Sequence, residues 1–512
     1  MKSLVNKFCI FIFLTVFTLI SFSNLFMFNN TKTVKADSGV NEITVFSWED
    51  YIDEGYDSAD DASEYLNSIF TPEELESSVL DIFEEQTGIK VNYQTFATCE
   101  EMYNELIKNP DACDLLCPSE YMILQMKREN LIKPYPVPQN YNKNVSPYIK
   151  GVFEDLGLNV IDENGDEKAY ATGYMWGTMG LLYNASNIEA EELVKWTNLY
   201  EEKFSNKITI KDSLRDTYIM AIAIVYEDEL YELKSRYEQG ALAKAEYKQE
   251  LTGIFNRTDE KTVNKVQKAL IELKDNLYGF EVDAGKNDIL TGKIDINFAW
   301  SGDAAYAIYE GEEADVELGY VVPETGSNLW FDGWVMAKNA NVENSLKFLD
   351  FIADPQIAIR NMEYIGYTSC IGGDDVFAYV QDAYDDDGEN QVDLKYFFDP
   401  EGITGNDYII NSSVVGGQLY AQYADEETIA RCVVMQEFQQ KDLIRINEMW
   451  YKIKLITWPV EVIWIIVLGA VLVIAGIVVY RFRNKIFSKI NVNEKAKTNK
   501  KGLTEISRTE IK

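Results

Sequence analysis

Two short segments, far apart in the sequence, place large aromatic side chains beside carboxylates. The first is Ser47-Trp48-Glu49-Asp50-Tyr51 and the second is Trp330-Phe331-Asp332-Gly333-Trp334. An aromatic ring attracts a cation over its face by about 0.5–2 kcal/mol, and a carboxylate supplies the counter-charge that a buried ammonium needs. Together the segments are typical of a pocket for a small organic cation. Taken singly, each is explained equally well by core aromatics next to surface acids.

The composition removes several classes of function. The chain of 512 residues has no histidine, which excludes Ser-His-Asp and Cys-His catalysis and histidine-containing metal sites. The net charge is −37, and basic residues gather at the two ends, so the body between them is strongly acidic. Such a body disfavours nucleic acid as a partner and favours an extracytoplasmic domain that attracts cations. The sequence has no phosphate-loop, dinucleotide or nucleophile-elbow motif, and we expect no cofactor and no metal.

Both ends of the chain carry apolar segments that predict contact with a membrane. Residues 1–36 combine early lysines with a long apolar run, which is typical of a signal peptide or an N-terminal anchor. Residues 456–480 contain an uncharged apolar run that basic residues follow, which predicts a transmembrane helix and a basic cytoplasmic tail over 481–512. A buried core helix is the alternative for this segment. Residues 37–455 would then form an extracellular domain.

Strand and helix signals alternate along this domain. A β-rich run over 42–46, an alternating run over 89–96 and a short apolar run over 114–117 predict strands. Thr71, Pro72 and Glu74 form a capping box that predicts a helix ending at Gly88, and Thr98 opens a second helix. This order predicts an α/β fold with a mainly parallel sheet and helices on both faces.

Two segments have the character of insertions, and the cysteines do not suggest a disulfide framework. Residues 53–70 predict a surface loop or short helix, and residues 226–275 predict exposed helices with charge pairs. Cys113 and Cys117 would lie about 13 Å apart in an extended strand, too far for a disulfide. This domain contains five cysteines, which therefore cannot all pair with one another: Cys99, Cys113, Cys117, Cys370 and Cys432.

In this order, the segments resemble the periplasmic spermidine/putrescine-binding proteins of ABC importers. The resemblance covers about residues 41–454 and depends on the order and spacing of several landmarks: 48–51, 87–91, 114–121, 174–178, 215–216, 299–302, 330–332 and 365–368. It implies a two-lobed periplasmic-binding-protein fold with a hinge and an interlobe cleft that closes on the ligand. Lobe one would comprise about 40–178 and 331–375, and lobe two about 179–330 and 376–454.

The resemblance also implies which side chains bind a ligand. Rings would pack against the methylene groups of a polyamine, while carboxylates and hydroxyls would accept its N–H donors. Asp332 would anchor an ammonium and Asp216 a terminal amine, although Asp216 could also be a salt-bridged helix residue. The candidate ligand-binding residues are Trp48, Glu49, Tyr51, Ser119, Tyr121, Asp216, Trp300, Trp330, Asp332, Tyr367 and Gln436. Glu49 departs from the family pattern, as does Ser213, which leaves the choice of amine open.

These expectations favour a membrane-anchored receptor that binds a polyamine and delivers it to the permease and ATPase of an ABC importer. A membrane helix is unusual for such receptors and would hold this one near its permease. The alternative is a sensory domain that reports the amine to a signalling partner, because the 481–512 tail is too short for an enzymatic module. A secreted hydrolase with paired carboxylates is a third interpretation, but 84 acidic residues make chance pairs inevitable.

Overall fold

The computed structural model of the chain describes residues 41–455 and 472–473. The predicted signal or anchor at 1–36, the tail at 481–512 and nearly all of the predicted transmembrane segment at 456–480 lie outside the described residues. Within the described ranges, no helix combines the length and the apolar character needed to cross a membrane. The chain divides into two compact units, 1–449 and 450–512, and the features below belong to the first, apart from the last residues of the helix over 440–454.

One eleven-stranded sheet forms the framework, with the strand order β10-β9-β11-β8-β13-β3-β1-β2 along its main path. Its strands are β1 (Glu42–Trp48), β2 (Lys90–Phe96), β3 (Leu115–Leu116), β4 (Ile132–Lys133), β8 (Ala171–Asn184), β9 (Ile208–Lys211), β10 (Leu277–Glu281), β11 (Ile296–Trp300), β12 (Leu318–Val321), β13 (Leu329–Ala337) and β14 (Thr368–Ser369). Two small sheets comprise β5 (Tyr135–Pro136), β6 (Asn159–Ile161) and β7 (Glu167–Ala169), and β15 (Asn390–Asp393) and β16 (Ile409–Ser412).

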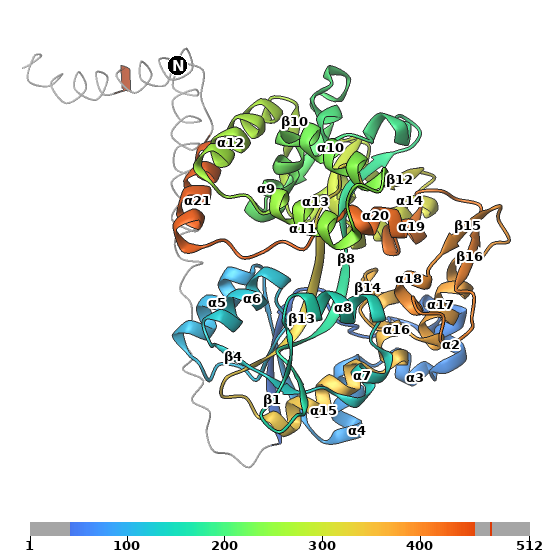
Figure 1. The fold of residues 1–512 in the computed structure, drawn as a ribbon. Coiled ribbons are helices and arrows are strands. Elements are labelled where there is room, and N and C mark those ends of the chain that lie inside the picture. Colours follow the sequence, from blue (N-terminus) through green and yellow to red (C-terminus); the bar gives the residue numbers. More distant parts are fainter. Residues whose placement is uncertain (1–40, 456–471, 474–512) are drawn as a thin grey trace, which may run out of the picture. The chain divides into compact units, whose positions relative to one another are not determined.

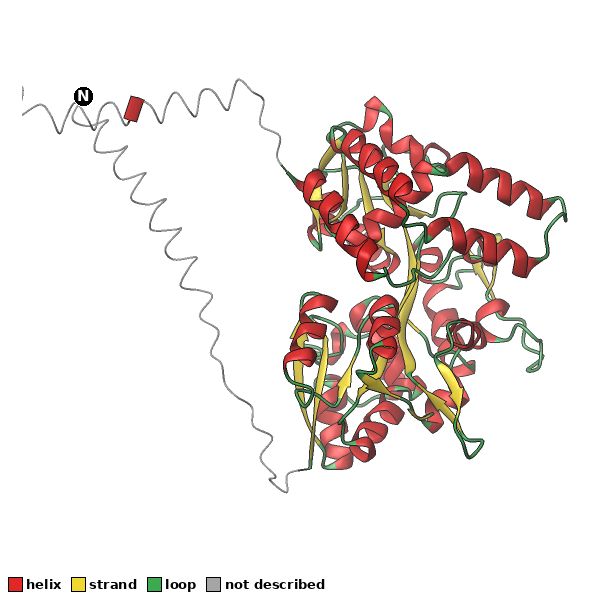
Figure 2. Cartoon of the chain, turned by 60° about the vertical axis from the view of Figure 1, so that its left-hand side comes forward, coloured by secondary structure: helices red, strands yellow, loops and turns green. Residues whose placement is uncertain are grey.

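Helices cover the strands in two groups, which we call the first and second lobes (Figures 1 and 2). The first lobe, around β1–β3, contains α4 (Val79–Thr87), α5 (Cys99–Lys108), α6 (Glu120–Arg128), α7 (Gln139–Asn144), α8 (Pro147–Asp155), α15 (Val342–Ile352) and α16 (Pro355–Ile365). The second, around β9–β11, contains α9 (Leu214–Val225), α10 (Glu227–Glu238), α11 (Lys244–Phe255), α12 (Glu260–Lys274), α13 (Ala284–Leu290), α14 (Ser301–Glu313), α19 (Gln418–Gln422) and α20 (Glu426–Arg431). The other helices are α2 (Glu64–Ile69), α3 (Pro72–Leu75), α17 (Asp374–Tyr384), α18 (Lys395–Phe398), α21 (Gln440–Lys454), η1 (Ala59–Asp61), η2 (Ala190–Leu193), η3 (Trp196–Tyr200) and η4 (Glu202–Phe204).

The long strands β8 and β13 run through both lobes and pair antiparallel, from Leu329 opposite Thr178 to Val335 opposite Ala171. On either side of them the pairs are parallel: β1 with β2 and β3, and β9 with β10 and β11. The expectation of a mainly parallel sheet is therefore correct only for the flanks, because the strands that pass between the lobes run in opposite directions. The lobe boundaries expected at 178/179 and 330/331 fall inside β8 and β13, and the boundaries themselves remain predictions.

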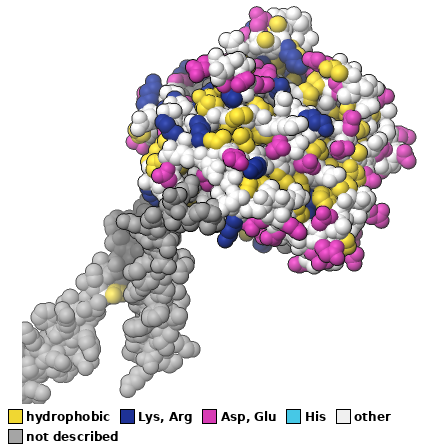
Figure 3. Space-filling view, turned by 90° about the horizontal axis from the view of Figure 1, so that it is seen from below, with side chains coloured by type: hydrophobic (Ala, Val, Ile, Leu, Met, Phe, Trp, Pro, Cys, Tyr) yellow, Lys and Arg dark blue, Asp and Glu magenta, His cyan; other side chains and the backbone are white. Residues whose placement is uncertain are grey.

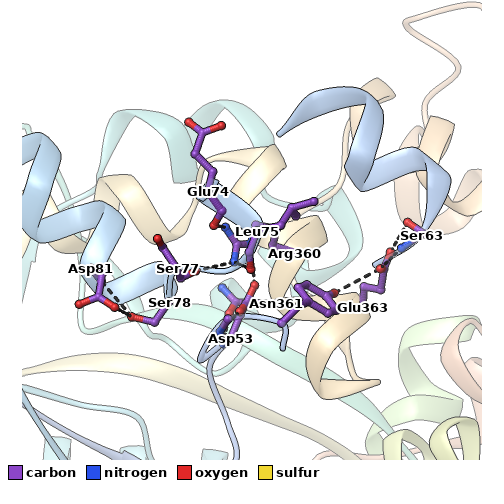
Figure 4. A network of polar contacts seen from close by, with 12 residues as sticks. Asp53, Ser63, Glu74, Leu75, Ser77, Ser78, Asp81, Arg360, Asn361 and Glu363 are labelled. Carbon is purple, nitrogen blue, oxygen red and sulfur yellow. Dashed lines mark hydrogen bonds and ion pairs between the residues drawn. The ribbon is translucent and has the colours of Figure 1, made fainter. Parts of the chain in front are cut away.

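The helix expected to run from Thr71 to Gly88 is in fact two helices. Thr71 caps α3 through the predicted box with Glu74, but α3 ends at Leu75, and Ser78 caps the new helix α4. The carbonyl groups of Glu74, Leu75 and Ser77 accept hydrogen bonds from the Arg360 guanidinium in α16 (Figure 4). Arg360 thus satisfies the carbonyls that a continuous helix would have used internally.

The segment 53–70 is only partly the surface loop or short helix that we expected. It does contain the short helices η1 and α2, but Asp53 at its start is fully buried. The Asp53 carboxylate lies 2.5 Å from Arg360 Nε, and its backbone N–H donates to Asn361 at 2.9 Å (Figure 4). The start of this segment is therefore a buried connection that holds α16 in place, and not a surface loop.

Two other expectations are confirmed. Residues 226–275 form α10, α11 and α12, whose polar faces carry ion pairs such as Arg236–Glu250. The five cysteines of residues 41–455 are all buried, and no disulfide joins any two of them, Cys113 and Cys117 included. They pack as small hydrophobic side chains.

Candidate functional site

Asp332 lies at the centre of the candidate site, on β13, where this strand passes between the lobes. Its carboxylate accepts two hydrogen bonds of 2.7 Å, one from the Tyr51 hydroxyl and one from the Ser119 hydroxyl. Tyr51 follows the end of β1, and Ser119 is the N-cap residue of α6, immediately after β3. The register of β13 against β8 shifts directly after Asp332, and such bulges redirect side chains. Three separate elements of the first lobe therefore converge on one carboxylate.

The electrostatic state of Asp332 is unusual. The residue is 7% exposed, and its burial raises its pKa to about 6, although the hydrogen bonds from Ser119 and Tyr51 oppose the rise and the charge of Asp216 adds to it. Within residues 41–455, no lysine or arginine forms an ion pair with Asp332. A buried carboxylate with hydroxyl partners alone is prepared to accept a cation.

Aromatic rings surround this carboxylate. Tyr51 makes edge contacts with Tyr174 and Tyr367, with ring centroids 5.4 and 5.6 Å apart, and Trp330 lies 5.6 Å from Tyr367. The Trp330 indole is oriented by a hydrogen bond from its N–H to the Thr178 carbonyl at 3.1 Å. The rings form a wall of fixed orientation, as recognition of an alkyl chain with charged ends requires.

Glycine makes the close packing of these rings possible. A Cβ on Gly302 would lie 1.9 Å from the Tyr367 ring, and one on Gly177 would lie 2.9 Å from the Trp330 ring. Both glycines stand in the site, Gly302 in the first turn of α14 and Gly177 in β8. A larger residue at either position would displace a ring of the wall.

The second lobe contributes Trp300, at the end of β11, and Asp216, in the first turn of α9. The Trp300 side chain forms a hydrogen bond with the Asp216 carboxylate, and Asp216 N–H donates to Ser213 Oγ at 3.4 Å. Burial raises the pKa of Asp216, although Ser213, Lys211, Arg215 and Trp300 oppose the rise. Because the charge of Asp216 raises the pKa of Asp332, the structure brings the predicted carboxylates of the two lobes into one electrostatic neighbourhood.

Tyr121 is placed at the contact between the lobes by Arg215. The Arg215 guanidinium lies 3.7 Å from the centroid of the Tyr121 ring and 4.5 Å from that of Phe438. Its Nη1 atom is buried without a hydrogen-bond partner. Tyr121 thus packs against a cation of the protein.

Three candidates stand apart from this group. Trp48 is half-buried at the end of β1, and its indole nitrogen has no hydrogen-bond partner among the described residues. Glu49, in the following turn, and Gln436 are both exposed. The backbone N–H of Gln436 donates to the Asn256 side chain at 2.8 Å. None of the hydrogen bonds or ring contacts described for residues 41–455 joins these three to Asp332, so their roles remain predictions.

Sequence reasoning missed three charged residues of the site: Glu120, Lys211 and Asp303. All three are buried. Glu120 lies within the landmark 114–121 and Asp303 directly follows the landmark 299–302, and this position at the ends of strands was the signal that could have found them. Lys211 has no such signal, because only the fold brings it to Trp300 and Asp303.

The fold and the site together define a class of protein. Two α/β lobes joined by crossover strands, with carboxylates and aromatic rings gathered where strands end and helices begin, are the architecture of a two-lobed solute receptor. Residues 78–386, more than half of the chain, match the family described as bacterial extracellular solute-binding protein. The chain belongs to that family.

Curated relatives carry polyamine names. The spermidine/putrescine-binding periplasmic protein of Salmonella typhimurium is 27% identical over 291 residues, which cover 56% of this chain and 72% of the relative. The putrescine-binding periplasmic protein PotF of Escherichia coli is 22% identical over 301 residues, again 56% of this chain and 72% of the relative.

Solved structures support the fold. The spermidine/putrescine ABC transporter substrate-binding protein PotD from Streptococcus pneumoniae, in complex with calcium and HEPES, matches with a TM-score of 0.52 and 23% identity. This match covers 81% of the present chain and 98% of that chain. The Tp0655 (TpPotD) lipoprotein of Treponema pallidum matches with a TM-score of 0.54 and 15% identity over 80% and 99% of the two chains.

Proposed function

We propose that this protein is an extracytoplasmic receptor that binds a polyamine of the putrescine/spermidine class and delivers it to the permease and ATPase of an ABC importer. One observation carries the proposal: the buried Asp332 carboxylate has hydroxyl partners and ring neighbours, but it forms no ion pair with a lysine or arginine of residues 41–455. An alkylammonium ion supplies the missing charge, and its methylene groups suit the Tyr51, Trp330 and Tyr367 rings. The names of the relatives agree with this chemistry.

We further propose that residues 456–480 anchor the receptor in the cell membrane, with the binding domain on the extracytoplasmic face. The support is the uncharged run over 462–480 and the basic residues that follow it. A chain truncated after residue 455 should leave the membrane fraction and appear in the soluble fraction, while the full chain stays membrane-bound. Recovery of both chains in the soluble fraction would count against the anchor.

The binding proposal is tested by titration calorimetry of the purified full-length chain with putrescine, spermidine and spermine. At least one amine should bind to the native protein, and Asp332→Asn should weaken that binding by about a hundredfold, because truncating a buried charged pair costs 2–5 kcal/mol. Asp399→Asn is a matched control, since Asp399 is 6% exposed and also accepts side-chain and backbone hydrogen bonds, but outside the site. Failure of every amine to bind at millimolar concentration would refute the proposal.

A further inference from the structure

The face of Trp300 carries a cation that belongs to the protein itself. Lys211 Nζ lies 4.2 Å from the centroid of the Trp300 ring, where the resemblance led us to expect ligand methylenes. The Lys211 side chain is 1% exposed. Its ammonium donates to Asp303 at 2.9 Å and to the Val282 carbonyl at 2.7 Å, and it lies 3.2 Å from Glu281. With three oxygen partners and a ring, this ammonium is fully satisfied and firmly held.

The carboxylates around Lys211 already face cations of the protein. Asp303 also accepts a hydrogen bond of 2.9 Å from the Tyr367 hydroxyl and lies 3.8 Å from the Lys286 ammonium. Asp216 interacts electrostatically with both Lys211 and Arg215. Three carboxylates on this side of the site (Asp216, Glu281 and Asp303) therefore face three cations of the protein (Lys211, Arg215 and Lys286). These three carboxylates are therefore already partnered before a ligand ammonium arrives.

The opposite side of the site holds two buried acidic side chains that form no ion pair with a lysine or arginine of residues 41–455. In the described part of the chain, the side-chain partners of Asp332 are the hydroxyl groups of Tyr51 and Ser119. Glu120, the first residue of α6, is 2% exposed, and its Oε2 atom is buried without a hydrogen-bond partner. The two groups lie close enough to interact: burial and, after it, the charge of Asp332 raise the pKa of Glu120 well above its usual range. Positive charge on a ligand is therefore attracted to the first lobe and repelled from Trp300.

We propose that Lys211 is a specificity-determining residue whose ammonium occupies the face of Trp300 in place of a ligand chain, so that the site prefers short amines with at most two ammonium groups to spermidine and spermine. The inference rests on the proposed function and specifies its substrate class. In a longer polyamine, an ammonium beyond the reach of Asp332 and Glu120 would meet the Lys211 charge at short range in a poorly hydrated site, where like charges repel strongly.

The test compares the affinities of putrescine and spermidine for the purified full-length chain by titration calorimetry. The native protein should bind putrescine at least tenfold more tightly than spermidine. Lys211→Met keeps a long side chain without the charge, and it should lower this ratio at least tenfold by improving spermidine binding. Lys248→Met is the matched control: Lys248 is a half-buried lysine that donates to the Cys432 carbonyl outside the site, and its loss should leave the ratio within twofold.

Lys211→Met leaves Glu281 without its cation and Asp303 with Lys286 alone, so the double variant Lys211→Met/Glu281→Gln provides the comparison if the single variant does not fold. A native protein that binds spermidine as tightly as putrescine, or variants that leave the ratio unchanged, would overturn the inference while the proposed function stands. Absence of binding by either amine would overturn the proposed function and the inference together.

Discussion

The buried Asp332 carboxylate suits ligand binding but lowers the stability of the unliganded fold. Its pKa rises from 3.8 in an unperturbed carboxyl to about 6 in the folded protein, so the folded state binds its proton more tightly than the unfolded state does. The ionised form therefore destabilises the unliganded fold. This cost is absent below about pH 4, grows as the pH rises through the two pKa values, and reaches about 3 kcal/mol above pH 6.

Replacing Asp332 by Asn should separate stability from binding. Without ligand at pH 7.5, we expect the free energy of unfolding of Asp332→Asn to exceed that of the native protein by about 1–3 kcal/mol, because the buried charge is removed. At pH 4 the difference should disappear. Urea unfolding monitored by tryptophan fluorescence measures both values. A variant that is less stable than the native protein at pH 7.5 would show that the hydrogen bonds to the carboxylate outweigh its desolvation.

The same pKa predicts how binding depends on pH. An ammonium pairs with the ionised form of Asp332, so binding should lower the pKa of the carboxyl and release a proton near pH 6. Affinity should be nearly constant above pH 7 and fall toward tenfold per pH unit below about pH 6. Calorimetry at pH 6 in buffers of different ionisation enthalpy measures the released proton directly. A flat affinity between pH 7.5 and 5 would contradict the role of Asp332 as the anchor.

At the scale of elements, α16 is held to the first lobe by one buried cation. Arg360 is fully buried, pairs with Asp53 and donates to the carbonyls that separate α3 from α4 (Figure 4). Directly after α16 come Gly366 and Tyr367, so the position of this helix also sets the position of a ring in the site. A long-range ion pair thus supports the wall around Asp332.

Arg360→Met should lower the free energy of unfolding by about 3–5 kcal/mol, because it leaves the Asp53 carboxylate buried without a partner. Lys347→Met in α15 is the control, since Lys347 forms an exposed pair with Glu343 four residues earlier, and its loss should cost less than about 0.5 kcal/mol. Chemical denaturation of the three proteins measures the effect. Equal stabilities would mean that Asp53 is protonated or hydrated in the folded protein.

These elements also show what a sequence can and cannot predict. The cap at Thr71 and the end of α4 at Gly88 were predictable because they depend on neighbouring residues, and the φ of Gly88 is +68°. The break between α3 and α4 was not, because its cause, Arg360, lies far along the chain. Asp332 was predictable from its aromatic neighbours, whereas Lys211 was not, since only the fold brings Asp303 and Glu281 to a lysine on β9.

At the scale of the whole molecule, the charge of −37 makes the protein a long-range attractor of cations. Acidic side chains are spread over the face seen in Figure 3, with fewer lysine and arginine side chains between them. We expect the association rate constant of an amine to fall several-fold between 50 and 500 mM NaCl, because salt shortens the range of this attraction from about 14 to 4 Å. Stopped-flow tryptophan fluorescence measures the rate constant. The dissociation rate constant should change less, and a dominant change in dissociation would contradict steering by the overall charge.

The order in which the strands are made has a consequence for biogenesis. In the sheet, β13 lies between β3 and β8, yet it is synthesised only after most of the second lobe. Until then the nascent N-terminal half exposes unpaired edges on β3 and β8, which are prone to wrong pairings. The pairing of β13 with β3 and β8 can therefore form only after residue 337 has been made, and we expect spontaneous refolding to be slow, as for other topologies dominated by distant contacts.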